Sequence, residues 1–585
     1  MSIKAFFISL ILFIGYIQYS SAQGYLKRNG QEIVNDNGPF LLRSIGSGNW
    51  MIQEGYMMQS TEVNVNTHTQ FRKKLSSIIG EQKTEEFYTY WLNNQFTKAD
   101  LDSMKSWGFN AIRPALHYKW FTLPIEEEKR SSNGELENTW LPKGFEILDS
   151  IVKWCKANEM YVIFDMHGTP GGQGKDANIN DYNPELPSLW ESEDNQKKLI
   201  ALWKEIAKRY KNESWVGGYE LINEPNWNVD GTGNQNGCNC SDNKALWDMH
   251  LKLIKAIRTI DNNHLIFISG NCWGNNYNGI ENHEVTISDN NIALTFHKYW
   301  NSNDQGAISS WLEMRAKYNL PIWMSESGEN SNQWFSDAIN LFESNNIGWS
   351  WWPVKKGRLN NIFRVITPQS YIDLLNSWGD GQVPLNSEQT YNAVMDYAKA
   401  QKVENCIVGK DVIFAMMHNG KPELTKPFLD HEINTWIQCA DFDLGNEGYA
   451  YHDVVSQNIH QGEVKWIPWN NGNKYRNDGI DIGQEDETYY VGWTEDGEWL
   501  QYTLTIPEDG LYQFKLKSSG NIGELVLKSN DKVISDIIPS GSTNKEVKWE
   551  ISKTDNIKLS KGTIKLRLFI TKGGSNIQSF CISPM

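Results

Sequence analysis

Cysteine is scarce in this chain of 585 residues, and the seven that are present are scattered. They do not form the closely spaced set of a disulfide-stapled scaffold, so hydrophobic cores must hold the fold together. Cys238 and Cys240 are separated by a single residue, which is not the paired Cys-x-x-Cys spacing of a zinc site. We interpret this segment as a loop that carries a disulfide to an unidentified partner, and we expect no metal site there.

Basic residues are too few for a nucleic-acid surface. The chain has 55 Lys and Arg against 71 Asp and Glu, which gives a formal charge of −16 and a pI of about 5.3. Phosphate binding needs clustered Lys and Arg. This balance therefore argues against nucleic acid as a partner and disfavours polyanionic substrates.

Long apolar runs are absent after the N-terminus. Near the start, Lys4 precedes an almost unbroken apolar run from Ala5 to Ile17, and the small residues Ser20, Ser21 and Ala22 follow. This is the pattern of a secretory signal, and the run is short for a membrane span, although a single-pass anchor is the alternative. We expect residues 1–22 to be removed. The product would be a secreted protein, extracellular or periplasmic, monomeric and without membrane contact.

Aromatic residues are abundant, with 26 Trp, 24 Tyr and 22 Phe. They indicate either a tryptophan-rich core or flat aromatic faces that stack on sugar rings.

Apolar runs alternate with helical patterns from residue 23 to about residue 403. Several runs are continuously apolar, as strands buried on both faces should be. Eight β/α alternations predict an α/β fold of the (β/α)8 TIM-barrel type, and the Gly-rich turn of a doubly wound dinucleotide-binding sheet is missing. The expected strands are 41–46, 110–115, 161–167, 218–224, 264–269, 291–297, 321–326 and 347–352, and helices are expected at 145–157, 195–210, 247–260 and 332–344.

The pattern changes after residue 403. Helical periodicity stops, and we place a linker at residues 404–430 that keeps the two domains apart. Short alternating strands such as 499–506, 512–517 and 564–570, with Asp-Gly and Asn-Gly turns between them, predict an all-β sandwich of jelly-roll type at residues 431–585.

Residues with catalytic side chains stand at or near the ends of the expected barrel strands. Because the C-terminal strand ends of a barrel converge on one face, residues far apart in sequence meet there. A structural hydrogen bond would explain any single His or Arg, but the coincidence of all of them favours an active site. These residues are Arg113, His167, Asn223, Glu224, His297, Tyr299, Glu326 and Trp352.

The two glutamates suit cleavage of a glycosidic bond. One would protonate the leaving oxygen while the other attacks the anomeric carbon, with carboxyl groups about 5 Å apart for retention or about 6.5–9.5 Å for inversion. The acid needs a raised pKa. Arg113 and Tyr299 are expected to hold the nucleophile ionised, and Asn223 to donate to a sugar hydroxyl.

The motifs around these residues resemble glycoside hydrolase family 5. This resemblance implies that Glu224 is the acid/base, that Glu326 is the nucleophile and that the other six residues line the subsite of the scissile sugar. Ser325 and Ser327 flank the nucleophile where the family usually has Gly and a bulky residue. The matching motifs are GFNAIRPALHY (108–118), VIFDMHGTPGG (162–172), YELINEP (219–225), TFHKYW (295–300), PIWMSESGE (321–329) and GWSWWPVKK (348–356).

The C-terminal region resembles carbohydrate-binding module family 6, on the stretches GYAYHDVV (448–455), RNDGIDIG (476–483), YYVGWTEDGEWLQYTL (489–504) and GGSNI (573–577). The resemblance implies that Tyr489 and Trp549 sandwich a sugar ring while Asn576 hydrogen-bonds its hydroxyls. The acids that normally help to hold a structural calcium are replaced at residues 438–440 and at Gln578, so calcium is disfavoured and no cofactor is expected.

Together these features predict a secreted, retaining glycoside hydrolase that cleaves β-glucosidic bonds in a β-1,3- or β-1,4-linked glucan. Residues 44–58 and 168–173 look most like the exo-β-1,3-glucanase and related β-glucan branches of the family. A β-mannanase, a transglycosylase and a catalytically silent glycan-binding protein are the alternatives. Endo or exo attack is left open.

Overall fold

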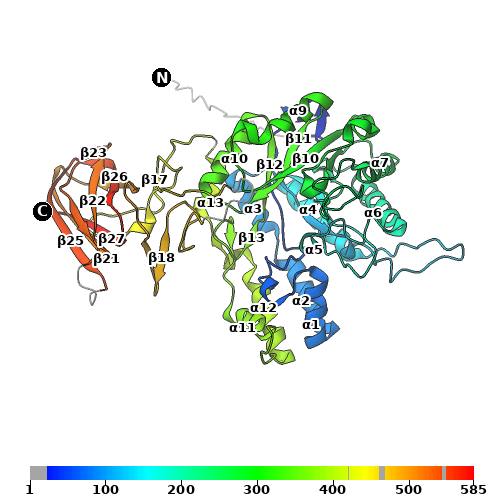
Figure 1. Cartoon of the computed structure of the whole chain (residues 1–585), viewed down its shortest axis with the longest axis horizontal. Helices are drawn as coiled ribbons and strands as arrows, with labels where there is room; N and C mark the ends of the chain where they lie inside the picture. Colours follow the sequence, from blue (N-terminus) through cyan, green and yellow to red (C-terminus); the bar gives the residue numbers. More distant parts are fainter. Residues whose placement is uncertain (1–22, 419, 460–467, 543–547) are drawn as a thin grey trace, which may run out of the picture.

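A parallel sheet that closes on itself forms the centre of the N-terminal domain (Figure 1). The computed structural model describes residues 23–418, 420–459, 468–542 and 548–585, so the expected signal segment lies outside the described residues. The strand order is β4-β12-β11-β10-β9-β8-β7-β5, with β6 also pairing with β7. A parallel bridge between Gly46 and Arg113 closes the ring, and Arg113 N donates to Ile45 O at 3.0 Å. The (β/α)8 barrel is confirmed.

The eight barrel positions match the expected strands, with shifted ends. Pro114 has no N–H for the ladder, so the second strand is divided into β5 and β6. The fourth strand ends at Glu220 rather than at Glu224, although Asn223 N still donates to Met166 O at 3.0 Å. The strands are β4 (Arg43–Ile45), β5 (Ala111–Ile112), β6 (Ala115–His117), β7 (Tyr161–Gly168), β8 (Val216–Glu220), β9 (Leu265–Ser269), β10 (Ile292–Lys298), β11 (Ile322–Gly328) and β12 (Gly348–Trp352).

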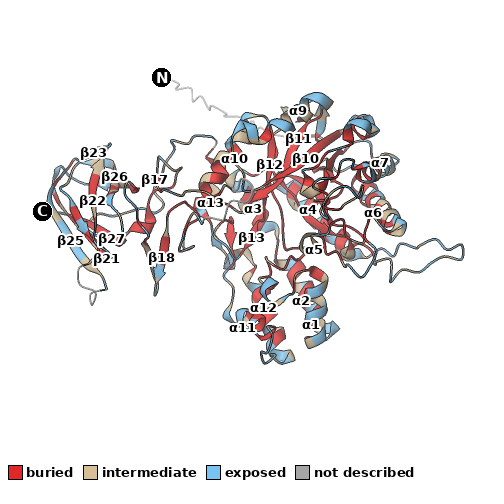
Figure 2. Ribbon diagram, in the orientation of Figure 1, coloured by how far each residue is buried: buried red, intermediate tan, exposed pale blue. Residues whose placement is uncertain are grey.

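Helices surround the barrel, and every residue of β7, β10 and β11 is buried (Figure 2). The four expected helices correspond to α4, α6, α7 and α10. Within the described residues, no helix has the length and apolar character needed to cross a bilayer. The helices along the barrel are α3 (Lys98–Trp107), α4 (Pro142–Ala157), α5 (Ala177–Asn180), α6 (Glu193–Tyr210), α7 (Lys244–Arg258), α8 (Asn271–Gly274), α9 (Ser309–Tyr318) and α10 (Asn332–Ser344).

Four further helices form a lobe beside the barrel (Figure 1). The helices α1 (His68–Ile79) and α2 (Glu81–Asn94) pack against α12 (Ser387–Ala400), which in turn packs against α11 (Gln369–Ser377). Two small sheets lie outside both this lobe and the barrel sheet. They are β1 (Lys27–Asn29), β2 (Glu32–Asn35) and β3 (Gly38–Pro39), and β13 (Lys355–Lys356), β14 (Phe363–Arg364) and β15 (Ile407–Val408).

The C-terminal region is a sandwich of two antiparallel sheets around its own apolar core. One sheet has the order β18-β19-β27-β21-β25 with β16 on β27, and the other has β17-β20-β26-β22-β23 with β24 on β22. The strands are β16 (Ile437–Gln438), β17 (Tyr451–His452), β18 (Ile482–Glu485), β19 (Thr488–Val491), β20 (Trp499–Ile506), β21 (Gly510–Gly520), β22 (Gly523–Ser529), β23 (Lys532–Val533), β24 (Ile538–Ser540), β25 (Glu550–Leu559), β26 (Gly562–Lys572) and β27 (Ser575–Pro584).

The sandwich is docked on the barrel, in contrast to the expected separation by a linker. Residues 404–430 contain β15 and the helix α13 (Lys410–Met417), which packs against α10 through an apolar face. Asn330, just after β11, donates to Asn458 O at 2.6 Å, and Asn477 donates to Asn330 O at 2.9 Å. Because these side chains are buried, the two domains share a hydrogen-bonded interface next to β11.

Candidate active site

The eight site residues expected in the barrel gather at the C-terminal ends of its strands. All are buried except Tyr299, which is half-buried. Arg113 connects them: Nη1 donates to Glu326 Oε2 at 2.7 Å, and Nη2 donates to Asn223 Oδ1 at 2.6 Å. Nε donates to Glu220 Oε2 at 2.5 Å, and Nη2 also lies 3.2 Å from Asp165 Oδ2. With several carboxylates around it, Arg113 remains a cation at this face.

Two donors hold the Glu326 carboxylate. Tyr299 OH donates to Oε1 at 3.0 Å, while Arg113 occupies the other oxygen. Burial raises the pKa of Glu326, and His297 and Arg113 act in the opposite direction. The hydrogen bonds from Tyr299 and Arg113 favour the ionised form of Glu326 and fix the direction in which its carboxylate points.

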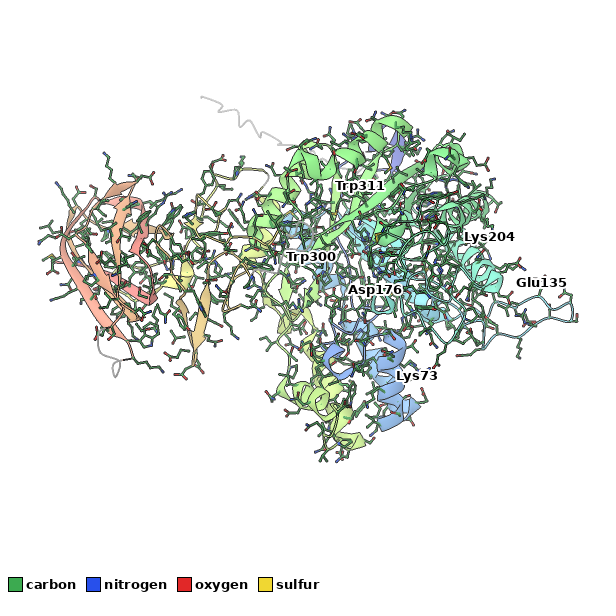
Figure 3. All side chains as sticks on the ribbon, viewed as in Figure 1. Lys73, Glu135, Asp176, Lys204, Trp300 and Trp311 are labelled. Atoms are coloured by element: carbon green, nitrogen blue, oxygen red, sulfur yellow. A yellow bond between two sulfur atoms is a disulfide. The ribbon has the colours of Figure 1, made fainter. Side chains whose placement is uncertain are left out.

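Glu224 has a different environment. Its Oε1 lies 2.6 Å from His297 Nδ1, and no ion pair with Lys or Arg joins it in the described chain. Burial raises the pKa of Glu224 well above its ordinary value, and the nearby charge of Asp176, labelled in Figure 3, adds to the effect. Burial lowers the pKa of His297 to about 4, so the imidazole is neutral at neutral pH, and its Nε2 lies 3.1 Å from Ser325 Oγ. Glu224 therefore keeps its proton to a higher pH than an exposed carboxyl would.

The two glutamates are close together. One oxygen of each, together with a His297 ring nitrogen, lies within 4.8 Å of the others. Such a group has the spacing of metal ligands, but a cation there would compete with Arg113 and Tyr299 for Glu326. A pair of carboxyls at this distance, one ionised and one protonated, can work on the two sides of one bond.

His167, Asn223 and Trp352 form the floor around the pair. The rings of His167 and Trp352 are stacked, with their centroids 4.8 Å apart and an interplanar angle of 4°. Asn223 Nδ2 points to His167 Nε2 at 3.3 Å, so the amide expected to face the sugar is largely engaged within the protein. Gly46 and Gly48 lie against the Trp352 ring, where a Cβ would come within 2.4 and 2.7 Å of ring atoms. This close approach explains why the loop after β4 uses glycine.

Glu54 and Tyr56 belong to the site although the sequence did not single them out. Glu54 is 3% exposed, and no described residue hydrogen-bonds to its Oε1. Burial, followed by the charges of Glu326 and Glu224, raises the pKa of Glu54 well above its ordinary value. Tyr56 OH accepts a hydrogen bond from Trp352 Nε1 at 3.0 Å. Glu54 Oε1 lies 3.8 Å from His167 Nε2, so it is a buried carboxyl oxygen near the pair Glu224 and Glu326 that no hydrogen bond from the described residues occupies.

Asp165 and Glu220 were also missed. Both are completely buried and hold Arg113 from below. Asp165 lies on β7 two positions before His167, so the two-residue period of inward-facing side chains was the available signal for it, whereas Glu220 is the last residue of β8.

A disulfide joins two loops beside the site. Cys238 bonds to Cys272, which follows β9, with Cα atoms 4.5 Å apart. This identifies the partner that the sequence left open. The loop of Cys238 is thereby attached to the catalytic end of the barrel.

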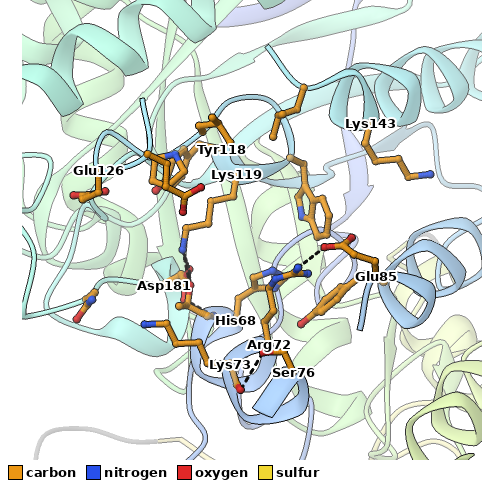
Figure 4. A pocket seen from close by; sticks show the side chains of 18 of the residues that line it. His68, Arg72, Lys73, Ser76, Glu85, Tyr118, Lys119, Glu126, Lys143 and Asp181 are labelled. Carbon is orange, nitrogen blue, oxygen red and sulfur yellow. Dashed lines mark hydrogen bonds and ion pairs between the residues drawn. The ribbon is translucent and has the colours of Figure 1, made fainter. Parts of the chain in front are cut away.

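A cavity of about 900 Å³ lies between α1, α2 and the segment that follows β6 (Figure 4). None of the expected site residues lines it. Its buried Asp181 pairs with Lys119 at 2.9 Å, and Arg72 pairs with Glu85. Although burial opposes this, Lys119 and His117 hold the pKa of Asp181 well below its ordinary range. These charges neutralise one another and need no ligand.

The sandwich has its own cleft of about 660 Å³, lined by Tyr490, Trp493 and Asn576. Tyr489 is not among the lining residues, because neighbours on a strand face opposite sides and its ring stacks on Tyr475 at 4.4 Å. Trp549 lies beside the Tyr490 ring, 5.8 Å away, and donates to Glu485. Of the three expected module residues, only Asn576 lines the cleft itself.

Comparisons with known proteins match both regions. Residues 66–358 match the cellulase model of glycosyl hydrolase family 5, and residues 473–584 match carbohydrate binding module family 6. A protein named beta-xylosidase from Phanerodontia chrysosporium is 25% identical over 60% of this chain and 75% of its own length. Endoglucanase C from Acetivibrio thermocellus is 27% identical over 39% of this chain and 57% of its own length. Probable glucan 1,3-beta-glucosidase A from Aspergillus niger is 23% identical over 50% of this chain and 63% of its own length. The chain thus spans little more than half of the last two relatives.

Proposed function

The chain belongs to glycosyl hydrolase family 5 and is a glycosidase, and we propose that it is a secreted, retaining hydrolase of β-linked glucan. In this proposal Glu224 is the acid/base and Glu326 is the nucleophile. The observation that carries it is the pair of carboxyl oxygens within 4.8 Å of each other in unlike environments. Retaining enzymes place their carboxyl groups about 5–5.5 Å apart, which leaves no room for the water that inversion requires.

The unlike environments support the division of roles. Glu326 accepts from Arg113 and Tyr299, so it is ionised and aimed for attack on the anomeric carbon. Glu224 is buried with neutral His297 as its partner, so it carries the proton for the leaving oxygen. After the glycosyl–Glu326 ester forms, Glu224 has lost its proton and can activate water to hydrolyse the ester. The second step consumes one water and returns both glutamates to their starting protonation states.

The proposed substrate is supported by the names of the relatives and by the C-terminal region. The relatives are named for xyloside, 1,3-glucan and endoglucanase activities, which share a β-linked sugar chain but not one linkage. Two names that refer to glucan, an endoglucanase and a glucan 1,3-beta-glucosidase, favour a β-glucan, as does a C-terminal region that matches a carbohydrate-binding module. Secretion rests on the N-terminal pattern at residues 1–22.

The stereochemical test uses proton NMR of the first product formed from laminarin, lichenan, cellulose, mannan and xylan oligosaccharides. The proposal expects retention and fastest turnover on a glucan. Early appearance of the inverted anomer would refute the mechanism, whereas retention with preference for mannan or xylan would refute only the substrate.

Azide rescue tests the roles. Glu326→Ala should be inactive on every substrate, and azide should return an α-glycosyl azide, because small anions enter from the vacated side. Glu224→Ala should keep its first step on an aryl glycoside with a very acidic phenol and yield a β-glycosyl azide. The opposite pairing of products would reverse the assignment.

A further inference from the structure

A further cleft, of about 330 Å³, lies between the barrel and the sandwich. Glu329, three residues after Glu326, lines it together with Arg358 and Asn360. Trp469 and Asn473 line the opposite wall and belong to the C-terminal region. This interdomain cleft is therefore built by both domains.

Aromatic rings connect the interdomain cleft to the catalytic pair. Tyr299, which donates to Glu326, lies beside Trp300 with ring centroids 5.6 Å apart. Trp300 Nε1 donates to Glu329 O at 3.2 Å, and the Trp300 side chain is 38% exposed. Figure 3 shows Trp300 on the part of the barrel near the sandwich. A polymer held at the catalytic carboxyls can thus continue along Trp300 toward Glu329 and the interdomain cleft.

One buried polar atom of the interdomain cleft's lining has no hydrogen-bond partner among the described residues. Asn360 is 8% exposed, and its Oδ1 accepts no hydrogen bond from any described residue. Buried polar atoms in native proteins are nearly always paired, so this position favours a ligand that brings a donor. Arg358 is exposed and offers a planar set of donors, and Trp469 is a half-buried aromatic ring. A sugar residue carries hydroxyl donors and acceptors on a ring with apolar faces, so it matches these groups of the cleft.

The docking of the sandwich keeps the two walls in register. Asn332 N donates to Asn477 O at 3.0 Å, and the Asn332 side chain reaches Asp478 at 3.1 Å. Arg364 pairs with Asp411 at 2.5 Å and donates to Tyr475 O at 2.8 Å. Directional hydrogen bonds of this kind fix one orientation of the domains.

We propose that the interdomain cleft is a subsite for a sugar residue of the polymer, remote from the cleavage point and shared by the two domains. Trp469 supplies the stacking face, while Asn360 and Arg358 bind hydroxyls. The inference rests on the proposed glycosidase function and extends it. The C-terminal region then lengthens the catalytic cleft and so has a second role besides holding the enzyme on a polymer.

The test compares a long and a short substrate. Wild type, Trp469→Ala and Arg358→Ala are assayed on the hexasaccharide that wild type cleaves fastest, from a panel of β-1,3-glucan, β-1,4-glucan, mannan and xylan hexamers, and on an aryl monoglycoside of the same sugar. The ratio of the two kcat/KM values should fall about tenfold for Trp469→Ala and severalfold for Arg358→Ala. Trp436→Ala, a tryptophan that is 46% exposed and lies outside both clefts of the sandwich, should keep the wild-type ratio.

Each outcome separates the two proposals. An unchanged ratio in both cleft variants overturns the subsite. If Trp469→Ala has a lower melting temperature than wild type, the subsite is judged from the ratio measured for Arg358→Ala, because Arg358 is exposed. Fastest cleavage of the mannan or xylan hexamer overturns the glucan assignment, while the ratio still tests the subsite. If wild type cleaves no hexamer, the proposed function fails, and calorimetric binding of the same hexamers to wild type and Trp469→Ala decides the subsite.

Discussion

Replacing Tyr299 with Phe tests how the site controls the charge of Glu326. The substitution removes one hydroxyl and with it the 3.0 Å hydrogen bond to Oε1, while Arg113 still holds Oε2. A hydrogen bond to a charged group contributes about 1.5–3 kcal/mol. Since one pKa unit corresponds to about 1.36 kcal/mol, the pKa of Glu326 should rise by about 1–2 units.

The sign of the change follows from the protonation states. The hydrogen bond from Tyr299 stabilises the ionised form of Glu326, and its loss favours the protonated form, which cannot attack. The acid limb of the kcat/KM profile should therefore move to higher pH by about 1–2 units. On the plateau above the limb the loss should stay below about tenfold, because Arg113 alone still aims the carboxylate.

The assay is a kcat/KM profile from about pH 3 to about pH 9 on an aryl glycoside, so that leaving-group protonation contributes little. Tyr512→Phe is the matched control, because its hydroxyl donates to Glu508 O at 2.8 Å within the sandwich and touches nothing in the barrel. A limb that stays in place or moves to lower pH would show that Tyr299 does not set the charge of Glu326.

Three further predictions concern other parts of the chain. Because the pKa of Glu54 is raised in the fold, its contribution to stability is complete below its ordinary pKa of 4.5 and is lost as the pH rises through the folded value. The melting temperature of Glu54→Gln should thus equal that of wild type at about pH 4 and exceed it at about pH 8. A difference in melting temperature that does not change with pH would contradict this. Asn477→Ala leaves Asn330 O and Asn332 Oδ1 unpaired and should cost about 1–3 kcal/mol by denaturant unfolding, whereas exposed Asn405→Ala should be neutral. Tyr490→Ala should weaken pull-down on insoluble glucan about tenfold at unchanged melting temperature, and equal loss of binding in Tyr489→Ala would refute the placement of the module cleft.

The barrel and its catalytic face were accessible from the sequence for a geometric reason. Parallel strands buried on both faces give apolar runs, and the closure of eight such strands brings their C-terminal ends together. Glu224 and Glu326 could therefore be paired across 102 positions of sequence without any local signal linking them. The end of β8 was misplaced furthest, by four residues, because the chain keeps a sheet hydrogen bond at Asn223 after the regular strand has ended.

What the sequence did not reveal depends on tertiary contacts. Glu54 lies in a loop without periodicity, and nothing local indicates that the loop folds back over His167. Tyr489 and Tyr490 cannot be told apart from residue type alone. In the structure β19 pairs with β18 so that Tyr490 lies over Gly483, where a Cβ would come within 2.3 Å of the Tyr490 ring. The packing of Tyr490 against Gly483 places Tyr490 in the cleft, and the sequence pattern does not indicate this contact.

The docked sandwich changes what its own sugar binding can do for catalysis. A module on a flexible tether raises the local concentration of polymer and accepts any chain direction. Here buried asparagines on both domains make directional hydrogen bonds, so the cleft of the sandwich, the interdomain cleft and the catalytic pair keep a fixed relation. A chain that occupies the sandwich productively must then enter the barrel in one direction and register. An apolar interface of the same size would hold the domains together but would tolerate sliding, and the polar interface therefore favours a role in substrate alignment.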